Sequence, residues 1–124
     1  MSTSLSPYKE YAKQPTIGGY ERGFIVLWIG VVAFLGVGDA VTTYYGVFHA
    51  GAGELNPFMD AVIAEYGAVG LFTVKAAAVG VLFPMGCFIY SDAPRLAYAT
   101  AAILAIGGLA VTVNNIVQIL TLVL

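Results

Sequence analysis

The sequence predicts an all-α integral membrane protein with three transmembrane helices and a short amphipathic helix at the membrane interface. Of its 124 residues, 60% are hydrophobic and only 10% are charged, and the mean hydropathy is +0.88. A soluble domain carries about a quarter of its residues as charged side chains, so this chain cannot cover a globule with polar surface. The apolar residues also gather into three runs, each at least as long as the roughly 20 residues needed to cross a bilayer.

A polar segment precedes the first apolar run. It holds Lys9, Glu10 and Lys13 among Ser, Thr, Pro and Gly, and it lacks the apolar stretch and small-residue cleavage site of a secretory signal. We therefore expect a cytoplasmic polar tail over residues 1–22 and a three-helix transmembrane domain over residues 23–124.

The three predicted spans contain very few charges. Residues 23–47 include only Asp39, residues 68–90 include only Lys75, and residues 96–124 include no charged side chain. Such runs are typical of transmembrane helices, because an ionised group inside the bilayer costs several kcal/mol.

Two features shape the second and third spans. Pro84 removes a backbone donor inside the 68–90 run and is expected to kink that helix. The 96–124 run is longer than a bilayer requires, so it should tilt or protrude. The link over residues 91–95 is so short that these two spans must be antiparallel neighbours.

A short helix is predicted over residues 57–66, in the link between the first and second spans. Asn56 is a good N-cap, and Pro57 suits the first helical position. The segment is too short to cross a membrane, so we expect it to lie at the interface. Its apolar residues recur at helical spacing: Phe58, Met59, Val62, Ile63 and Tyr66.

The basic residues predict the orientation. The first link contains neither Lys nor Arg, whereas the tail and the second link do, and basic residues favour the cytoplasmic side. The tail and the second link should therefore face the cytoplasm, and the first link and the C-terminus should lie outside. The basic residues that decide this are Lys9, Lys13, Arg22 and Arg95.

The two charges inside the spans lie at the same depth. At a helical rise of 1.5 Å per residue, Asp39 lies roughly 12 Å inward from Val47, and Lys75 lies roughly 11 Å inward from Ala68. An ion pair between Asp39 and Lys75 is therefore expected. Because side chains lean toward the helix N-terminus, we expect the two charged groups to be offset by several Å, with amides and threonines filling the gap.

The last span adds amide side chains at a similar depth. Asn114 and Asn115 lie roughly 14 to 15 Å from the C-terminal end, and Gln118 roughly 9 Å. Asn114 and Gln118 share one helix face, and we expect that face to meet the face that carries Asp39 and the threonines three and four residues later. The predicted polar cluster comprises Asp39, Thr42, Thr43, Lys75, Asn114, Asn115 and Gln118.

Two interpretations of this cluster remain open. It can be a structural clasp, in which a neutral ion pair and amide donors fix the register of the helices. It can also be a site for an ion, a proton or a solute, since ionisable groups inside a membrane often mark such pathways. For Lys75 alone, a third possibility is that it extends along a lipid-facing surface toward the headgroups.

Other classes of function are excluded by composition and motifs. The net charge of −2 gives no basic surface for nucleic acid. Cys87 is the single cysteine and His49 the single histidine, so neither a disulfide nor a metal site is expected. No phosphate-binding loop or nucleophile motif is present. We therefore expect no catalytic residues, no cofactor and no enzyme activity.

Three short segments carry a resemblance to a known family. They are Asp-Ala-Val-Thr-Thr at 39–43, Glu-Leu-Asn-Pro at 54–57, and Lys75. In this order they resemble an uncharacterised family of small prokaryotic multi-span membrane proteins, frequent in halophilic archaea. The resemblance covers roughly residues 30–120. It implies the three-span plan and the polar layer, and no reaction.

The resemblance also draws attention to Glu54, Asn56 and Pro57 in the outer link. Glu54 and Asn56 can fold onto the outer side of the polar layer and bring a second carboxylate near Lys75. The simpler arrangement has Asn56 as a helix cap and Glu54 in water.

Two functions are consistent with these observations. The first is a non-catalytic subunit or assembly component, packed against the lipid bilayer and either copies of itself or a larger membrane complex. The second is an oligomeric ion- or proton-coupled small transporter or channel that uses Asp39 and Lys75. Replacing Asp39 by Asn separates them, because a subunit would lose stability or assembly and a transporter would lose flux alone.

Overall fold

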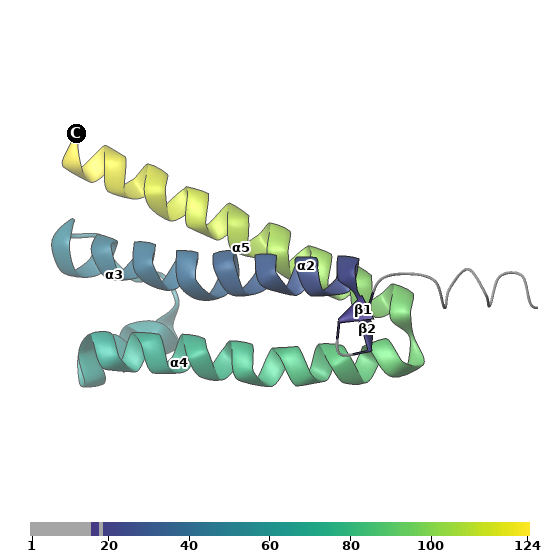
Figure 1. Cartoon of the computed structure of the whole chain (residues 1–124). Helices are drawn as coiled ribbons and strands as arrows, with labels where there is room; N and C mark the ends of the chain where they lie inside the picture. Colours follow the sequence, from purple (N-terminus) through teal and green to yellow (C-terminus); the bar gives the residue numbers. More distant parts are fainter. Residues whose placement is uncertain (1–15, 18) are drawn as a thin grey trace, which may run out of the picture.

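The computed structural model describes residues 16–17 and 19–124, and within them the protein is a bundle of three long helices (Figure 1). Each helix is long and apolar enough to cross a membrane, which confirms the all-α, three-span prediction. The three candidate spans are Arg22–His49, Pro57–Asp92 and Pro94–Val123.

The first span is one continuous helical rod built from three segments, α2 (Arg22–Gly30), η2 (Val31–Gly38) and α3 (Asp39–His49). The middle segment is a π-helix, in which the Asp39 backbone N–H donates to the Phe34 carbonyl five residues earlier. This wider turn was not predicted from the sequence. Thr112 Oγ1, on the third span, also donates to the Phe34 carbonyl at 3.0 Å.

The second span, α4 (Pro57–Asp92), contains a sharp break. Gly67 has φ 66° and ψ −148°, a conformation that is essentially restricted to glycine. The break separates a helical segment over residues 57–66 from the long remainder of α4. The backbone leaves the helical region at Gly67 and not at Pro84, where a kink was expected from the sequence.

The third span, α5 (Pro94–Val123), follows α4 after a single residue, Ala93. The two helices run antiparallel and meet at this turn, as Figure 1 shows. At their other ends α4 and α5 lie on opposite sides of α3, so the bundle opens toward the end that carries the C-terminus.

The closed end of the bundle holds the aromatic part of the core. Phe24 and Trp28 on the first span are 0% and 3% exposed, and the centroid of the Phe24 ring lies 4.6 Å from that of Tyr90 on α4. The Glu21 backbone N–H donates to Tyr90 Oη at 3.3 Å, and Tyr98 Oη donates to Glu21 Oε2 at 2.7 Å. The start of the first span is thereby bonded to both of the other helices.

A small hairpin precedes the first span. Strands β1 (Thr16–Ile17) and β2 (Tyr20–Glu21) pair antiparallel, with Thr16 opposite Glu21. From the sequence, this region was expected only to form part of a polar tail. The rest of that predicted tail, residues 1–15 and 18, lies outside the described residues.

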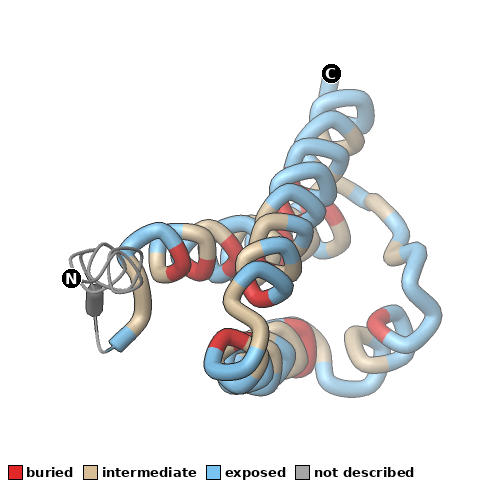
Figure 2. The backbone as a smooth tube through the Cα atoms, turned by 90° about the vertical axis from the view of Figure 1, so that its right-hand side faces the viewer, coloured by how far each residue is buried: buried red, intermediate tan, exposed pale blue. Residues whose placement is uncertain are grey.

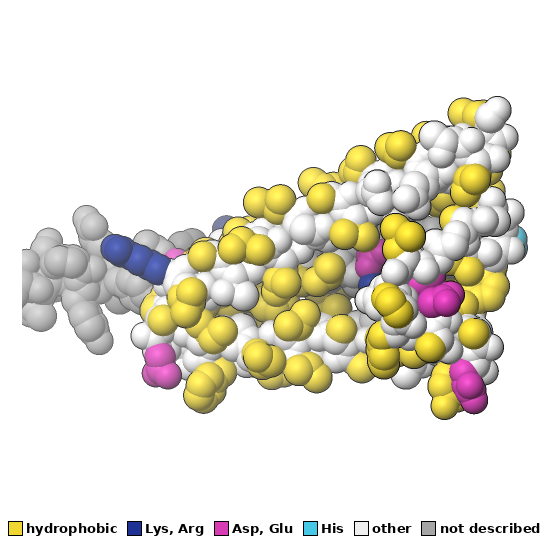
Figure 3. Space-filling model, turned by 180° about the vertical axis from the view of Figure 1, so that it is seen from behind, with side chains coloured by type: hydrophobic (Ala, Val, Ile, Leu, Met, Phe, Trp, Pro, Cys, Tyr) yellow, Lys and Arg dark blue, Asp and Glu magenta, His cyan; other side chains and the backbone are white. Residues whose placement is uncertain are grey.

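The buried residues lie where the helices face each other, and the outer surfaces of the helices are exposed (Figure 2). Apolar side chains cover much of the face seen in Figure 3. This is the distribution expected of helices that face lipid.

Candidate functional site

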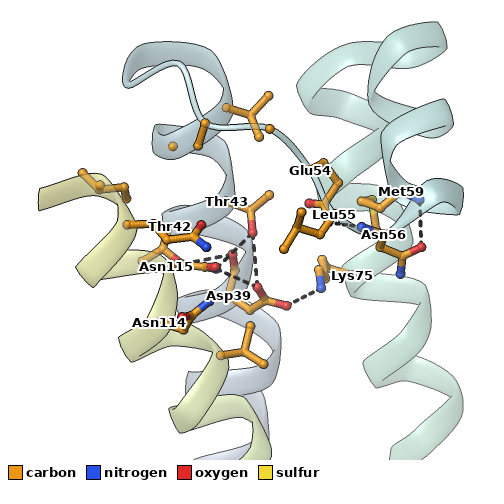
Figure 4. Close-up of a pocket in the computed structure, with 17 residues that line it drawn as sticks. Asp39, Thr42, Thr43, Glu54, Leu55, Asn56, Met59, Lys75, Asn114 and Asn115 are labelled. Atoms are coloured by element: carbon orange, nitrogen blue, oxygen red, sulfur yellow. Dashed lines mark hydrogen bonds and ion pairs between the residues drawn. The ribbon is translucent and has the colours of Figure 1, made fainter. Parts of the chain in front are cut away.

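The site is centred on Asp39, the first residue of α3, which is only 6% exposed. Its Oδ2 forms an ion pair with Nζ of Lys75 on α4. Its Oδ1 accepts hydrogen bonds from Thr43 Oγ1 at 3.2 Å and from Asn115 Nδ2 at 3.1 Å (Figure 4). Both carboxylate oxygens therefore have partners, and these partners come from all three spans.

Asn115 links α5 to the first span at more than one point. Its Nδ2 lies within hydrogen-bond distance of Thr42 Oγ1 at 3.0 Å and Thr43 Oγ1 at 3.3 Å, in addition to Asp39. Thr42 Oγ1 in turn donates to the Gly38 carbonyl at 2.7 Å, at the end of the π-helix. The network therefore continues from the carboxylate into the backbone of η2.

The structure brings together most of the residues that the sequence singled out, with two differences. Lys75 contacts Asp39 directly, so the expected offset of several Å between the charged groups is absent. The amide that reaches the carboxylate belongs to Asn115, whereas Asn114 and Gln118 make no side-chain hydrogen bond to the cluster in the described part of the chain. Asn114 and Gln118 do line the cavity beside Asp39, but the amide that donates to the carboxylate is that of the next residue, Asn115.

Helical geometry explains the correction. Each residue turns the helix by about 100°, so adjacent asparagines cannot both point at α3. Asn115 lies on the same face of α5 as Thr112 and Gly108, three and seven residues earlier, and both are buried against the first span. The spacing of Gly108, Thr112 and Asn115 along one face of α5 was the signal in the sequence that could have identified Asn115 and Thr112 as contacts of the first span.

A polar cavity of about 340 Å³ lies beside the ion pair and is partly open. The loop that enters α4 runs along one side of it in Figure 4, and Figure 3 shows acidic and basic side chains inside a hollow between the helices. The cavity is lined by Asp39, Thr42, Thr43, Gly46, Val47, Ala52, Gly53, Glu54, Leu55, Asn56, Met59, Lys75, Val111, Asn114, Asn115, Gln118 and Ile119.

The link between α3 and α4 combines the two arrangements considered for it. Asn56 is the N-cap of α4, and its Oδ1 accepts from the backbone N–H groups of Phe58 at 3.0 Å and Met59 at 3.4 Å. Glu54 Oε1 accepts from the Asn56 backbone N–H at 3.0 Å. Both side chains also line the cavity, while Pro57 is exposed at the first position of α4 and does not line it.

The cavity is lined by charged side chains and by side chains that form hydrogen bonds. It contains two carboxylates, one ammonium group, two threonine hydroxyls and amide side chains. Among residues 16–17 and 19–124, no group of three or more His, Cys, Asp or Glu side chains is placed to hold a metal ion. The lining groups can bind a polar or charged molecule, or they can bind each other.

One curated relative is a viral protein. The chain is 34% identical over 56 residues to a protein from a virus (isolate Australia/Victoria) that carries the name "Putative transmembrane protein ORF13". The match covers 45% of this chain and 57% of the relative, so the chain spans little more than half of the relative's length. No solved structure matches the chain.

The family comparison covers most of the membrane domain. The profile of the family described as "Domain of unknown function (DUF5658)" matches residues 30–121. That range begins in α2 and ends near the C-terminus, and it includes Asp39, Lys75, Asn115 and the whole link between α3 and α4. The chain is an integral membrane protein of three apolar helices, and it belongs to the DUF5658 family.

Proposed function

We propose that the protein is a non-catalytic subunit of a membrane assembly, formed either with copies of itself or with a larger complex. The proposal rests on the position of the polar cavity. The cavity is partly open, and its lining includes Asn114, which is exposed on a helix apolar enough to cross a membrane. An amide and a partly exposed lysine at this depth are unfavourable against lipid, so a covering protein surface would stabilise them.

Both oxygens of the Asp39 carboxylate have partners, which supports a structural role for the ion pair. Its carboxylate accepts from Thr43 and Asn115 and pairs with Lys75. Each interhelical hydrogen bond in a membrane contributes on the order of 0.6 to 2 kcal/mol. Such a network fixes the rotation of each span about its axis and thereby shapes the surface offered to a partner.

The proposed orientation places the closed end of the bundle in the cytoplasm. Arg22 begins the first span, and Arg95 is the second residue of α5, at the same end of the bundle. The opposite end carries Glu54, Asp60 and Glu65, and no Lys or Arg occurs in the link there. This charge distribution favours a cytoplasmic N-terminus and an outer C-terminus.

The test is the native mass of the protein extracted gently from its own membrane, combined with crosslinking at the cavity. We expect a mass above that of the 13.0 kDa monomer, with either copies of this chain or a second protein in fixed ratio. In a Cys87→Ser background, Asn114→Cys should crosslink to the neighbouring subunit under oxidising conditions or with a short thiol-to-amine reagent.

Ile103→Cys is the matched control for crosslinking. Ile103 is 69% exposed on the same helix but does not line the cavity. Crosslinking through Ile103 and not Asn114 would mean that the chains associate away from the cavity. A monomeric mass without a stoichiometric partner would contradict the proposal.

Transport by an oligomer is the second candidate, favoured by the cavity of about 340 Å³ beside the ion pair. Three spans do not readily enclose a pathway, so this function also requires several copies. The Asp39→Asn variant separates the two candidates in reconstituted vesicles. Lost ion flux with an unchanged native mass would favour transport, and loss of the assembly itself would favour the subunit role.

A further inference from the structure

The Glu54 carboxylate in the wall of the cavity has no basic partner among the described residues. Its Oε1 accepts from the Asn56 backbone N–H at 3.0 Å, and the single ion pair in the described part of the chain joins Lys75 to Asp39. With both carboxylates ionised, the lining carries two negative charges and one positive charge, a net charge of −1. The positive charge is already taken up by Asp39, which leaves Glu54 uncompensated.

Amide oxygens add to this negative potential. Asn115 uses its Nδ2 as the donor to Asp39, Thr42 and Thr43, so its carbonyl oxygen is left as an acceptor. Asn114 and Gln118 line the same cavity, and no side-chain hydrogen bond is formed by either within the described residues. Carboxylate and amide oxygens are the ligands that hard cations and N–H donors prefer.

We propose that this cavity binds a small monovalent cation, held by the Glu54 carboxylate and by the amides of Asn114 and Gln118. The volume of about 340 Å³ lies within the range of small-molecule sites. It can therefore take a partly hydrated alkali ion or a primary ammonium compound, which share this recognition chemistry. The inference depends on the cavity alone and requires neither transport nor a covering partner.

The experiment is a cation titration of the full-length protein in lipid nanodiscs at constant ionic strength. N-methyl-D-glucamine chloride is replaced stepwise by sodium, potassium or methylammonium chloride, and binding is followed by calorimetry and by the thermal unfolding temperature. We expect saturable binding and a rise in Tm with at least one of these cations. Selectivity for sodium or potassium identifies an inorganic ion, and selectivity for methylammonium identifies an amine. Wild-type protein that shows no saturable binding of any of the three overturns the proposal.

Glu54→Gln tests the assigned anchor. The variant keeps the shape of the side chain and removes its charge, so affinity should fall about tenfold or more. Glu65→Gln is the matched control, because it makes the same charge change at an exposed position outside the cavity. Equal loss of affinity in the two variants would show that the cation is attracted by surface charge in general, and it would overturn the proposed site.

A second variant keeps the test valid if the Glu54 substitution disturbs the link. Gln118→Leu removes an amide from α5 without touching the loop or the Asp39 network, and the proposal predicts weaker binding with an unchanged Tm in the absence of added cation. Unchanged affinity in Gln118→Leu together with unchanged affinity in Glu54→Gln would rule out binding in this cavity.

Discussion

Asp39 is a buried charge that is stable only because its neighbours replace the water it has lost. Desolvating a carboxylate costs several kcal/mol. Here an ammonium group, a hydroxyl and an amide surround the two oxygens, and the side chain of the partner Lys75 keeps 24% of its surface exposed. The pair therefore depends on both members, and removing either one leaves a charge without its ion-pair partner.

We predict that Asp39→Asn lowers the free energy of unfolding by about 3 kcal/mol, because Lys75 loses its ion-pair partner. Lys75→Met should have an effect of similar size, since it leaves the carboxylate charged and half-satisfied. The measurement is reversible unfolding in mixed detergent micelles. The double variant should regain most of the lost stability, because it buries no unpaired charge.

Additive losses in the double variant would contradict this prediction. They would show that Asp39 and Lys75 stabilise the fold through separate contacts. Thr73→Val supplies a control for substitutions in α4, because Thr73 is exposed and lies outside the cavity. Its effect on stability should stay within about 0.5 kcal/mol.

The sequence predicted the depth and the residues of this polar layer, but not which amide donates a hydrogen bond to Asp39. Depth follows from counting residues along a helix, so Asp39 and Lys75 could be matched by their positions in the chain alone. Rotation about the helix axis is harder, because an error of one residue turns a side chain by about 100°. Of the two adjacent asparagines, the sequence favoured the face of Asn114, whereas in the structure Asn115 donates to Asp39 on α3.

At the scale of elements, the close approach of α5 to η2 sets the geometry of the bundle. A Cβ atom built on Gly108 would lie 2.4 Å from the backbone nitrogen of Leu35 and 2.7 Å from its Cα. The π-helix exposes its Phe34 carbonyl at the same contact, where Thr112 donates to it. Glycine on one helix and a widened turn on the other thus allow two backbones to pack almost directly together.

We predict that Gly108→Ala destabilises the protein by about 1–3 kcal/mol, because the added methyl group meets backbone atoms that cannot move aside. Gly107→Ala is the control one residue away, where a Cβ meets nothing within 4 Å. The control should leave stability unchanged or raise it by up to about 1 kcal/mol through helix propensity. Equal effects of the two substitutions on thermal unfolding would show that this contact does not limit packing.

Long helices were predictable from the sequence, whereas interruptions within them were not. Twenty or more apolar residues in a row identify a span without further information. Within the π-helix, the Phe34 carbonyl accepts a hydrogen bond from Thr112, seventy-eight residues later, and no local sequence pattern predicts such a contact. The break at Gly67 has a different, local cause, because φ near +66° favours glycine, whereas a proline ring can be accommodated in a membrane helix.

At the scale of the whole molecule, the two ends of the bundle differ in charge and in packing. The end with the α4–α5 turn is closed by aromatic rings and the Glu21 hydrogen bonds. At the opposite end the helices are spread apart, the side chains are acidic, and the cavity lies between the helices. The composition predicted a membrane protein, but it carried no information about a partner, because the surfaces that face lipid and those that face another helix are similarly apolar.

We predict that the open end faces the outside of the cell. In a Cys87→Ser background, Ala64→Cys should react with a membrane-impermeant maleimide in intact cells, and Ser91→Cys should react only after the membrane is permeabilised. Both positions are exposed, and neither changes a charged residue, so the positive-inside bias of the chain is kept. Labelling of Ser91→Cys alone in intact cells would invert the proposed topology.

The packing of Trp28 provides the protein with an internal optical probe. Trp28 is the single tryptophan of the chain. Its indole is 3% exposed against Gly86, and its Nε1 is the one buried polar side-chain atom without a hydrogen-bond partner among the described residues. An indole that is shielded from water and from hydrogen bonding emits at short wavelength and resists aqueous quenchers. Its fluorescence therefore reports when unfolding exposes the indole to water, without any added label.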